Sequence, residues 1–376
     1  MSEPTLLSAA EARDYMVGQA GLRAVVHPPG DAGLRAMLLA RRCVQLDPLD
    51  PIGTNADLVA IARLDGVRAG QVYDALLPGY AFEHFAKERC LLPAGAFPHY
   101  RERLVQTPWW RLSERLKRLP QGVIEAVLAQ LRDHGPLRAD QLDDHGAVEA
   151  MDWSGWKGTS RAATMALEVL QTRCQVVVAG RTTAGKLYDV PERALPHVAE
   201  APPAGDFGRW ALTERVEAAG LLSLAGGPQW SMLNEVRTSG LPEQLVAEGV
   251  LETVIVEGSR RICLAPAGFR ERTFPEDDGR MRVLGPLDPL LWDRKLVRQA
   301  FGFEYIWEVY KPAAKRRWGW YVCPLLHQGR LVGRVEAHRA DGRIVVDRVW
   351  KEPGVGFDDA AFGEAIARHE RALFGG

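Results

Sequence analysis

The chain has 376 residues, of which 47% are hydrophobic and 25% charged, with a net charge of −1 at neutral pH. This composition excludes a disordered or fibrous protein, and the length predicts two to four domains because one core rarely spans so many residues. Apolar runs fall short of the roughly 20 residues that a membrane helix requires, so we expect no membrane partner. The start has neither the basic nor the apolar region of a secretion signal, which favours a cytoplasmic protein.

The first stretch of the chain is predicted to be helical, with strands at its end. Ser8 and Glu11 form a capping-box pattern at the start of a helix, and later apolar residues recur at helical spacing. The predicted elements are helices over 8–21, 32–42 and 68–77 and a strand or strand pair over 81–93.

Two further stretches follow the order helix, helix, helix, hairpin, which is typical of winged-helix units. In the second stretch a turn at Gly135-Pro136 separates two helices, and a third helix is expected from about Thr159. The same order recurs from Trp210, with a hairpin turn at Gly258-Ser259. The predicted hairpin strands lie at 174–180 and 186–190 in the second stretch and at 253–258 and 260–266 in the third.

Beyond Met281 the pattern is mostly β. Alternating runs over 303–310 and 319–350 predict strands, with turns at Gln328-Gly329 and Asp341-Gly342, and a closing helix covers 358–374. Residues 281–350 carry 13 Lys and Arg against 7 Asp and Glu. Such segregated charge indicates a face that meets a polyanion, although a solvated surface explains it equally well.

The predicted fold is therefore mainly α with β (α+β), formed by tandem winged-helix units and a small C-terminal β-barrel or sandwich. The predicted domains are a first winged-helix unit over 1–118, a second over 119–200, a third over 201–278, and a basic β-barrel-like domain with its closing helix over 279–376. Five scattered cysteines and nine dispersed histidines show no metal-binding spacing, so we expect reduced thiols, no disulfide and no metal or other cofactor.

A polar pair, Gln45 and Asp47, follows the second predicted helix, where Pro48 prevents the helix from continuing. Residues two apart on an extended chain point to the same side. On spacing alone, the pair is more often a turn that ends a helix than part of a catalytic site.

Three segments together resemble the winged-helix DNA glycosylases of the AlkZ/YcaQ family. They are Gln45-Leu46-Asp47, the segment DWSGWKGTSRAATMALEVL with the later YDVPERALP, and LGPLDPLLWDRK with FGFEYIWEVYKPAAKRRWGWYVCPLL. The resemblance covers nearly the whole chain. It implies an enzyme that removes bulky N-alkylated purines from DNA and, in some members, unhooks interstrand crosslinks. The chain departs from the family where it reads DPIGTNADL instead of a basic, histidine-containing stretch.

The resemblance also assigns the catalytic residues, because the family motif Gln-x-Asp matches Gln45 and Asp47. Breaking an N-glycosidic bond gives a sugar with oxocarbenium character, which a carboxylate stabilises while it activates water. A cationic alkylpurine leaves as a neutral base, so no acid is needed. We expect Asp47 to activate water, Gln45 to hold the water or sugar, and the reaction to be monofunctional, without a lysine Schiff base or full extrusion of the base.

The expected partner is double-stranded DNA with alkylated purines, bound by a monomer that associates with the nucleoid when it acts. A non-enzymatic winged-helix transcriptional regulator is the alternative, and a scaffolding protein is a third possibility.

The cations at 311–317 are expected to lie at a hairpin tip, and residues 157–160 at a helix N-terminus that could bind phosphate. Solvated turns and simple helix caps explain both patterns as well, and Trp153, Trp156, Trp292, His84 and His327 are assigned to packing. The predicted DNA-binding residues are Arg41, Arg42, Lys157, Thr159, Ser160, Lys311, Lys315, Arg316, Arg317 and Trp318.

Overall fold

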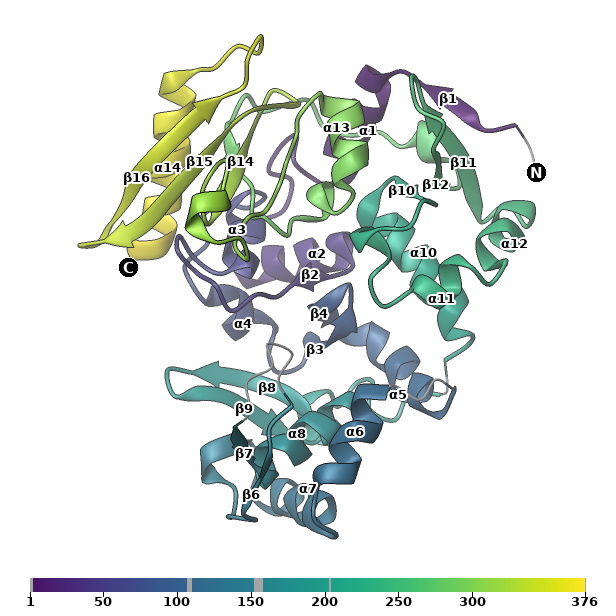
Figure 1. Cartoon of the computed structure of the whole chain (residues 1–376), viewed down its shortest axis with the longest axis vertical. Coiled ribbons are helices and arrows are strands. Elements are labelled where there is room, and N and C mark those ends of the chain that lie inside the picture. The colour runs from purple at the N-terminus through teal and green to yellow at the C-terminus, as the bar shows by residue number, and fades with distance from the viewer. Residues whose placement is uncertain (1–2, 107–109, 152–157, 203, 376) are drawn as a thin grey trace. The chain divides into compact units, whose positions relative to one another are not determined.

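The computed structural model describes residues 3–106, 110–151, 158–202 and 204–375 (Figure 1). Its contacts divide the chain into two compact units. Unit 1 comprises Met1–Val72, Phe85–Cys90 and Gly208–Gly376, and unit 2 comprises Tyr73–His84 and Leu91–Phe207. Within the part of the chain that the structure describes, no helix combines the length and the apolar character needed to cross a membrane.

Three segments share a similar order of elements: a helix, a short strand, helical segments and then two paired strands. In the second, a 3-10 turn and the strands β6 (Ala147–Glu149) and β7 (Thr159–Arg161) stand between the short strand and the last helix. The first repeat consists of α2 (Asp31–Arg41), β2 (Val44–Gln45), α3 (Asn55–Ile61), α4 (Gln71–Leu76), β3 (Ala81–Ala86) and β4 (Glu88–Pro93). The second consists of α7 (Val123–His134), β5 (Leu137–Arg138), a 3-10 turn (Ala139–Gln141), α8 (Ala162–Thr172), β8 (Val177–Thr182) and β9 (Gly185–Asp189). The third consists of α10 (Phe207–Ala219), β10 (Leu222–Ser223), α11 (Asn234–Arg237), α12 (Leu241–Ala247), β11 (Leu251–Val256) and β12 (Ile262–Pro266).

The sheets of the three repeats have the same topology, which supports the predicted tandem winged-helix fold. In each, the third strand lies between the first and the second, giving the orders β2-β4-β3, β5-β9-β8 and β10-β12-β11. The third sheet gains a fourth strand, because β1 (Thr5–Leu7) pairs in parallel with β11. The N-terminal residues therefore complete the sheet of the third repeat.

Local sequence signals account for several of these elements. The capping box predicted at Ser8 is present, with the Ser8 side chain accepting from the Glu11 amide, and it starts α1 (Ala9–Gln19). Thr54 and Asp57 form a second capping box at the start of α3. The predicted helix after Gly135-Pro136 is wrong, since only the short 3-10 turn forms there. The chain between the first two repeats forms α5 (Phe97–Gln106) and α6 (Trp110–Arg118).

The C-terminal segment forms an open antiparallel sheet rather than a closed barrel. Its strands are β13 (Arg282–Val283), β14 (Val322–His327), β15 (Arg330–Ala340) and β16 (Arg343–Lys351), and α14 (Asp359–Phe374) packs against β16 and β13 (Figure 1). Both predicted hairpin turns form, at Gln328-Gly329 and Asp341-Gly342. All four turn residues have positive φ, as a type I′ turn requires.

The predicted strand over 303–310 does not form. The chain between α13 (Arg294–Phe301) and β14 is irregular and contains a short 3-10 turn at Ala313–Lys315. Two of its aromatic residues point into the core instead, since Phe303 and Tyr305 are buried and the Tyr305 hydroxyl donates to the Val322 carbonyl at 2.8 Å. These residues join α1, α13 and the third-repeat sheet in one hydrophobic cluster.

Candidate active site

The predicted catalytic pair lies where the first strand of the first repeat ends. Strand β2 finishes at Gln45, and the Leu46 amide still donates to the Arg89 carbonyl at 2.8 Å. Asp47 then begins the loop that leads to α3. Gln45 is 6% exposed, whereas Asp47 is only half-buried. Of the two side chains, only the Asp47 carboxylate is therefore substantially accessible to solvent.

Two buried polar side chains fix Gln45 in place. The Lys87 ammonium donates to Gln45 Oε1 at 3.0 Å, and the Asn55 amide donates to the Gln45 carbonyl at 2.8 Å. Because a lysine ammonium can only donate, this contact also settles which end of the Gln45 amide is oxygen. The Nε2 donor of Gln45 has no acceptor among the residues that the structure describes. Gln45 can therefore offer a hydrogen-bond donor to an external group.

The Asp47 carboxylate is held at one oxygen and open at the other. The Leu49 amide donates to Asp47 Oδ1 at 2.9 Å, closing a turn over Pro48. Burial raises the pKa of Asp47 above its ordinary value, and the hydrogen bond from Leu49 opposes that rise only in part. A carboxylate of raised pKa is a stronger base toward water, which is the property that proton abstraction needs.

Lys87 is a site residue that the sequence analysis missed. It lies in the turn between β3 and β4, is 6% exposed, and stands over the Trp292 ring with 5.5 Å between Nζ and the ring centroid. Burial, with an additional contribution from Arg215, lowers the pKa of Lys87 to about 8. Lys87 is 42 residues from Gln45 in the sequence. No local pattern predicts their contact.

The segment LGPLDPLLWDRK packs directly behind the pair. Asp288 forms a bidentate, fully buried ion pair with Arg63, at 2.8 and 3.0 Å. A Cβ on Gly285 would lie 2.4 Å from Asn55 Oδ1, so only glycine fits against the residue that holds Gln45. Trp292 from the same segment lies beneath Lys87. One of the segments that carry the family resemblance thus packs against the residues that hold Gln45.

The two arginines predicted to flank the site lie in different environments. Arg41 is buried, donates to the Gln19 carbonyl, and has its pKa lowered by burial to about 9. Its guanidinium therefore lies in the protein interior. Arg42 is partly exposed and pairs with Glu214 at 3.3 Å. Of the two, only Arg42 presents its side chain to solvent.

The phosphate-binding site predicted at a helix N-terminus does not form at residues 159 and 160. Thr159 and Ser160 belong to β7 (Thr159–Arg161), which pairs with β6 (Ala147–Glu149), and α8 begins only after Arg161. Their amides are therefore not the free N–H groups of a helix start. Lys157 lies outside the described residues, as do Trp153 and Trp156.

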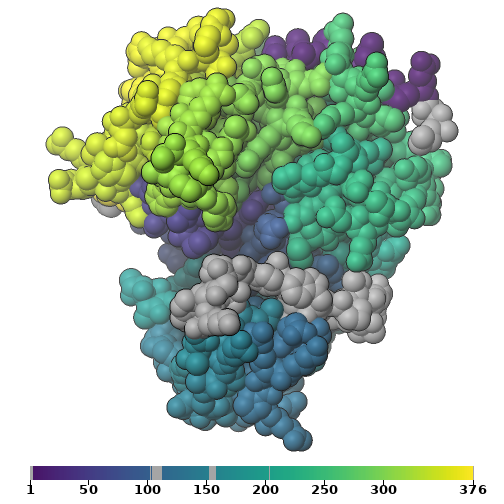
Figure 2. All heavy atoms as spheres, viewed as in Figure 1, coloured from purple at the N-terminus to yellow at the C-terminus, as the bar shows by residue number. Residues whose placement is uncertain are grey.

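The cationic loop, residues 311–317, is exposed but is an irregular loop rather than a hairpin tip; its segment lies on the face shown in Figure 2. Glu308 anchors it by accepting hydrogen bonds from the Arg317 and Trp318 amides at 2.9 and 2.7 Å. Burial of Glu308 disfavours its charge, but the hydrogen bonds from Lys311 and these amides prevail and lower its pKa to about 2. The loop therefore keeps one shape over the physiological pH range.

The side chains of the loop differ in whether they are held by ion pairs or by packing. Lys311 pairs with Glu308 and Arg317 with Glu304, at 2.8 and 2.7 Å. Lys315 is exposed and has no ion-pair partner among the described residues. Trp318 is turned inward, with the Arg334 guanidinium 3.9 Å from its ring centroid. The sequence predicts that Trp318 binds DNA, but its inward position packs it against Arg334, and the Arg316 guanidinium donates to the Lys311 carbonyl at 2.8 Å.

The remaining residues assigned to packing are buried where the structure describes them. His84 and His327 each contact a backbone carbonyl at 3.1 Å, and the Trp292 indole donates to the Leu287 carbonyl at 3.1 Å. All five cysteines are free and buried. A search of the described residues finds no cluster of His, Cys, Asp or Glu suited to a metal ion.

Comparison with known proteins places this geometry in context. A family model described as DNA glycosylase AlkZ-like matches residues 39–372, a range that includes Gln45, Asp47, Lys87 and the segment around Asp288. The fold is similar to that of the DNA glycosylase AlkZ of Streptomyces sahachiroi, with a TM-score of 0.57 and 16% sequence identity over 98% of each chain.

Proposed function

The chain belongs to the AlkZ-like DNA glycosylase family and is a DNA glycosylase, and we propose that it hydrolyses the N-glycosidic bond of purines made cationic by alkylation at N7 or N3. The observation that carries this proposal is the half-buried Asp47 carboxylate beside an amide held by Lys87, while the exposed Asp50 of the same loop is paired with Arg339. A site with one carboxylate suits a leaving group that needs no protonation.

The proposed reaction uses the positive charge already on the substrate. When the C1′–N9 bond breaks, its electron pair passes to the purine and neutralises the alkylated ring. The sugar acquires oxocarbenium character, and the negative charge of Asp47 stabilises it. The oxygen of a water molecule then bonds to C1′, and the proton released goes to the Asp47 carboxylate. The products are a neutral alkylpurine and an abasic sugar.

Gln45 is proposed to position the sugar or the water as a hydrogen-bond donor. Its Oε1 is occupied by Lys87, so only Nε2 is available to the substrate. Lys87 itself is buried and engaged with Gln45 and Trp292. This engagement favours a monofunctional reaction, because a lysine that forms a Schiff base must reach the abasic sugar. Borohydride should therefore not trap a covalent enzyme–DNA complex.

The decisive experiment compares Asp47→Asn with Asp50→Asn on a duplex that contains one N7-methylguanine. Asp50 is an exposed aspartate in the same loop, paired with Arg339, so its variant controls for the loss of one negative charge near the site. We expect Asp47→Asn to bind the duplex but to release base at least 100-fold more slowly, while Asp50→Asn stays within a few-fold of wild type. Release by Asp47→Asn at the wild-type rate would contradict the proposal.

The choice of substrate class has its own test. A duplex with uracil or hypoxanthine presents an uncharged base, which would need protonation to leave. We expect no measurable release from these duplexes under conditions in which N7-methylguanine is excised. A crosslink through alkylated purine N7 has the same cationic leaving group, so unhooking of such crosslinks belongs to the proposal. Efficient excision of uncharged bases would indicate an acid that this site does not provide.

The cationic loop is proposed to contact DNA phosphates. Replacing Lys315, Arg316 and Arg317 by Ala should weaken duplex binding and lower the salt dependence of affinity by about one for each phosphate that the variant no longer neutralises. Arg298→Ala, at an exposed position of α13, is the single-cation control. If the triple variant kept the wild-type salt dependence, phosphate contacts would have to be sought elsewhere on the protein.

A further inference from the structure

Unit 1 contains a cavity of about 840 Å³ that the glycosylase site does not use. It lies between the chain that follows α3, the segment before β13, and the C-terminal half of α14. None of Gln45, Asp47 and Lys87 lines it. Its volume is within the range of small-molecule sites, which span about 300 to 1,000 Å³. We call it the α14 cavity.

The charged lining of the α14 cavity is predominantly positive. Four arginines line it, against two carboxylates, which leaves an excess of two positive charges. The arginines come from all three walls: one follows α3, one precedes β13, and two lie on α14. The charged lining residues are Arg68, Arg280, Arg368, Arg371, Asp65 and Glu364.

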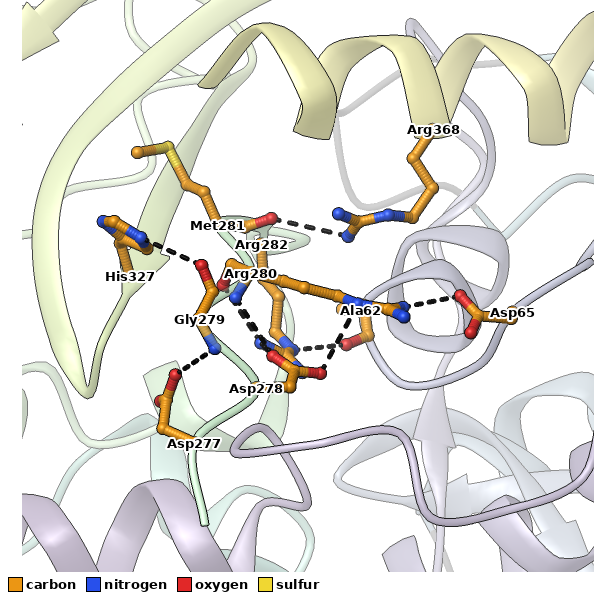
Figure 3. Close-up of polar contacts among 10 residues, drawn as sticks. All are labelled: Ala62, Asp65, Asp277, Asp278, Gly279, Arg280, Met281, Arg282, His327 and Arg368. Atoms are coloured by element: carbon orange, nitrogen blue, oxygen red, sulfur yellow. Dashed lines mark hydrogen bonds and ion pairs between the residues drawn. The ribbon is translucent and has the colours of Figure 1, made fainter. Parts of the chain in front are cut away.

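The aspartates near the cavity are already engaged (Figure 3). Arg280 binds Asp65 at 2.7 Å, and the buried Arg282 binds Asp278 at 2.7 Å. Arg282 also donates to the Ala62 carbonyl at 3.0 Å. These contacts tie the segment before β13 to the chain that follows α3, and they leave neither aspartate for the next arginine.

That arginine is Arg368, whose guanidinium lies beside Arg280 in Figure 3. It contacts the Met281 carbonyl at a long 3.5 Å and forms no ion pair with any described residue. Burial, followed by the nearby charges of Arg280 and Arg282, lowers the pKa of Arg368. A half-buried guanidinium next to two others, without a carboxylate of its own, is stabilised when an anion binds.

The same three segments also supply an apolar part of the lining, formed by Ile61, Leu64, Val67, Met281 and Ala372. A site with clustered arginines on an apolar wall suits a ligand that has a compact anionic group and an uncharged, flat or apolar body. A phosphate monoester carries up to two negative charges at neutral pH, which equals the positive excess of the lining.

We propose that the α14 cavity binds a phosphate group attached to a body of nucleoside size, with Arg368 as its principal ligand and Arg280 and Arg68 beside it. A free nucleoside monophosphate and a terminal phosphate on a DNA strand share this chemistry. The site is separate from the glycosylase pair, and its occupation would be detectable without any base excision.

The first arm of the test measures binding of 2′-deoxyadenosine monophosphate by calorimetry and by thermal shift, with inorganic phosphate and deoxyadenosine as partial ligands. Wild type should bind the monophosphate more tightly than either partial ligand, and Arg368→Gln should weaken that binding at least tenfold. Arg343→Gln, an exposed arginine of β16, should leave it unchanged. Arg68→Gln, at the exposed rim, gives a second reading if Arg368→Gln is too unstable to measure.

The second arm identifies the source of the phosphate. Short duplexes with and without a 5′-terminal phosphate are compared for binding to wild type and Arg368→Gln. A preference for the phosphorylated end that Arg368→Gln abolishes assigns the cavity to DNA ends, whereas monophosphate binding without such a preference assigns it to a free nucleotide. If neither ligand binds in an Arg368-dependent manner, the proposal is wrong, whatever the glycosylase activity of the variants.

Discussion

Lys87→Met should make the protein more stable and less active, because Lys87 is a buried cation retained for its contact with Gln45. The side chain is 6% exposed, and its pKa is lowered from 10.5 to about 8. That difference corresponds to roughly 3 kcal/mol of unfolding free energy lost when the lysine is charged in the folded protein. Removing the ammonium leaves Gln45 Oε1 without its donor, which costs about 1–2 kcal/mol. The net expected gain at pH 7 is about 1–2 kcal/mol.

The pH dependence distinguishes this explanation from a simple packing effect. The unfolded chain holds the Lys87 proton up to about pH 10.5 and the folded chain only up to about pH 8, so the unfolded state binds more protons between these values. Wild-type stability should therefore rise with pH across this window relative to Lys87→Met. Urea unfolding of both proteins at intervals from pH 7 to 10.5 measures the difference. A difference that does not change with pH would refute the assignment of Lys87 as a buried cation.

The activity of Lys87→Met tests whether Lys87 positions the Gln45 amide. Without Lys87, the Gln45 amide is free to rotate, and we expect the rate of base release to fall by roughly 5- to 100-fold, the equivalent of about 1–3 kcal/mol. The affinity for an undamaged duplex should not change, since Lys87 is buried. Wild type should also lose activity as the pH rises through about 8 and Lys87 becomes neutral. If Lys87→Met kept that alkaline decline, another group would be responsible for it.

Three further predictions concern the same site. The raised pKa of Asp47 should shift the acid limb of base release above pH 3.8, and wild-type stability relative to Asp47→Asn should fall as pH rises through that pKa; rate and denaturation profiles from pH 3 to 8 measure both. Asp288→Asn leaves Arg63 buried without its counter-charge and should cost about 3–5 kcal/mol in urea unfolding, and a loss below 1 kcal/mol would contradict the buried pair. Gly285→Ala should cost about 1–3 kcal/mol and slow base release by displacing Asn55; unaltered kinetics would show that Asn55 does not hold Gln45.

The sequence predicted those elements whose determinants are local. The capping box at Ser8 depends on two residues three apart, and the turns at Gln328-Gly329 and Asp341-Gly342 depend on residues that tolerate positive φ. The strands β14 and β15 on either side of the first turn are rich in apolar residues and are largely buried, without a strict alternation. Gln45 and Asp47 do follow α2 as the sequence predicts, but the helix already ends at Arg41, where Arg42 takes a positive φ, and not at Pro48.

The predictions that were wrong depended on distant parts of the chain. Residues 303–310 have high β propensity but form no strand, because buried Glu308 binds the backbone of the cationic loop instead of a strand partner. Arg41 has the sequence context of a solvated helix end, yet it donates to the Gln19 carbonyl inside the protein. The contact between Lys87 and Gln45 spans 42 residues, and only the pairing of β2 with β4 brings the two together.

The three repeats differ in the turn between their last two strands. In the second and third repeats, the turn between the last two strands is exposed, at Thr183-Ala184 and at Glu257-Gly258. In the first repeat, the corresponding turn carries Lys87, which is buried against Trp292. The turn between the last two strands of this repeat therefore contributes a buried side chain to the candidate site.

The first strand of the sheet also differs between the repeats, in the group that binds its backbone carbonyl. In the third repeat, the carbonyl of Ser223 on β10 accepts from the Trp230 indole at 2.7 Å, so an aromatic packing residue satisfies it. In the first repeat, the carbonyl of Gln45 on β2 accepts from Asn55, and the side chain of Gln45 adds the contact with Lys87. Buried polar groups that cost stability thus replace packing residues on the same framework. The shared framework thus accounts for the fold of all three repeats, and the contacts of Asn55 and Lys87 with Gln45 are what the first repeat adds to it.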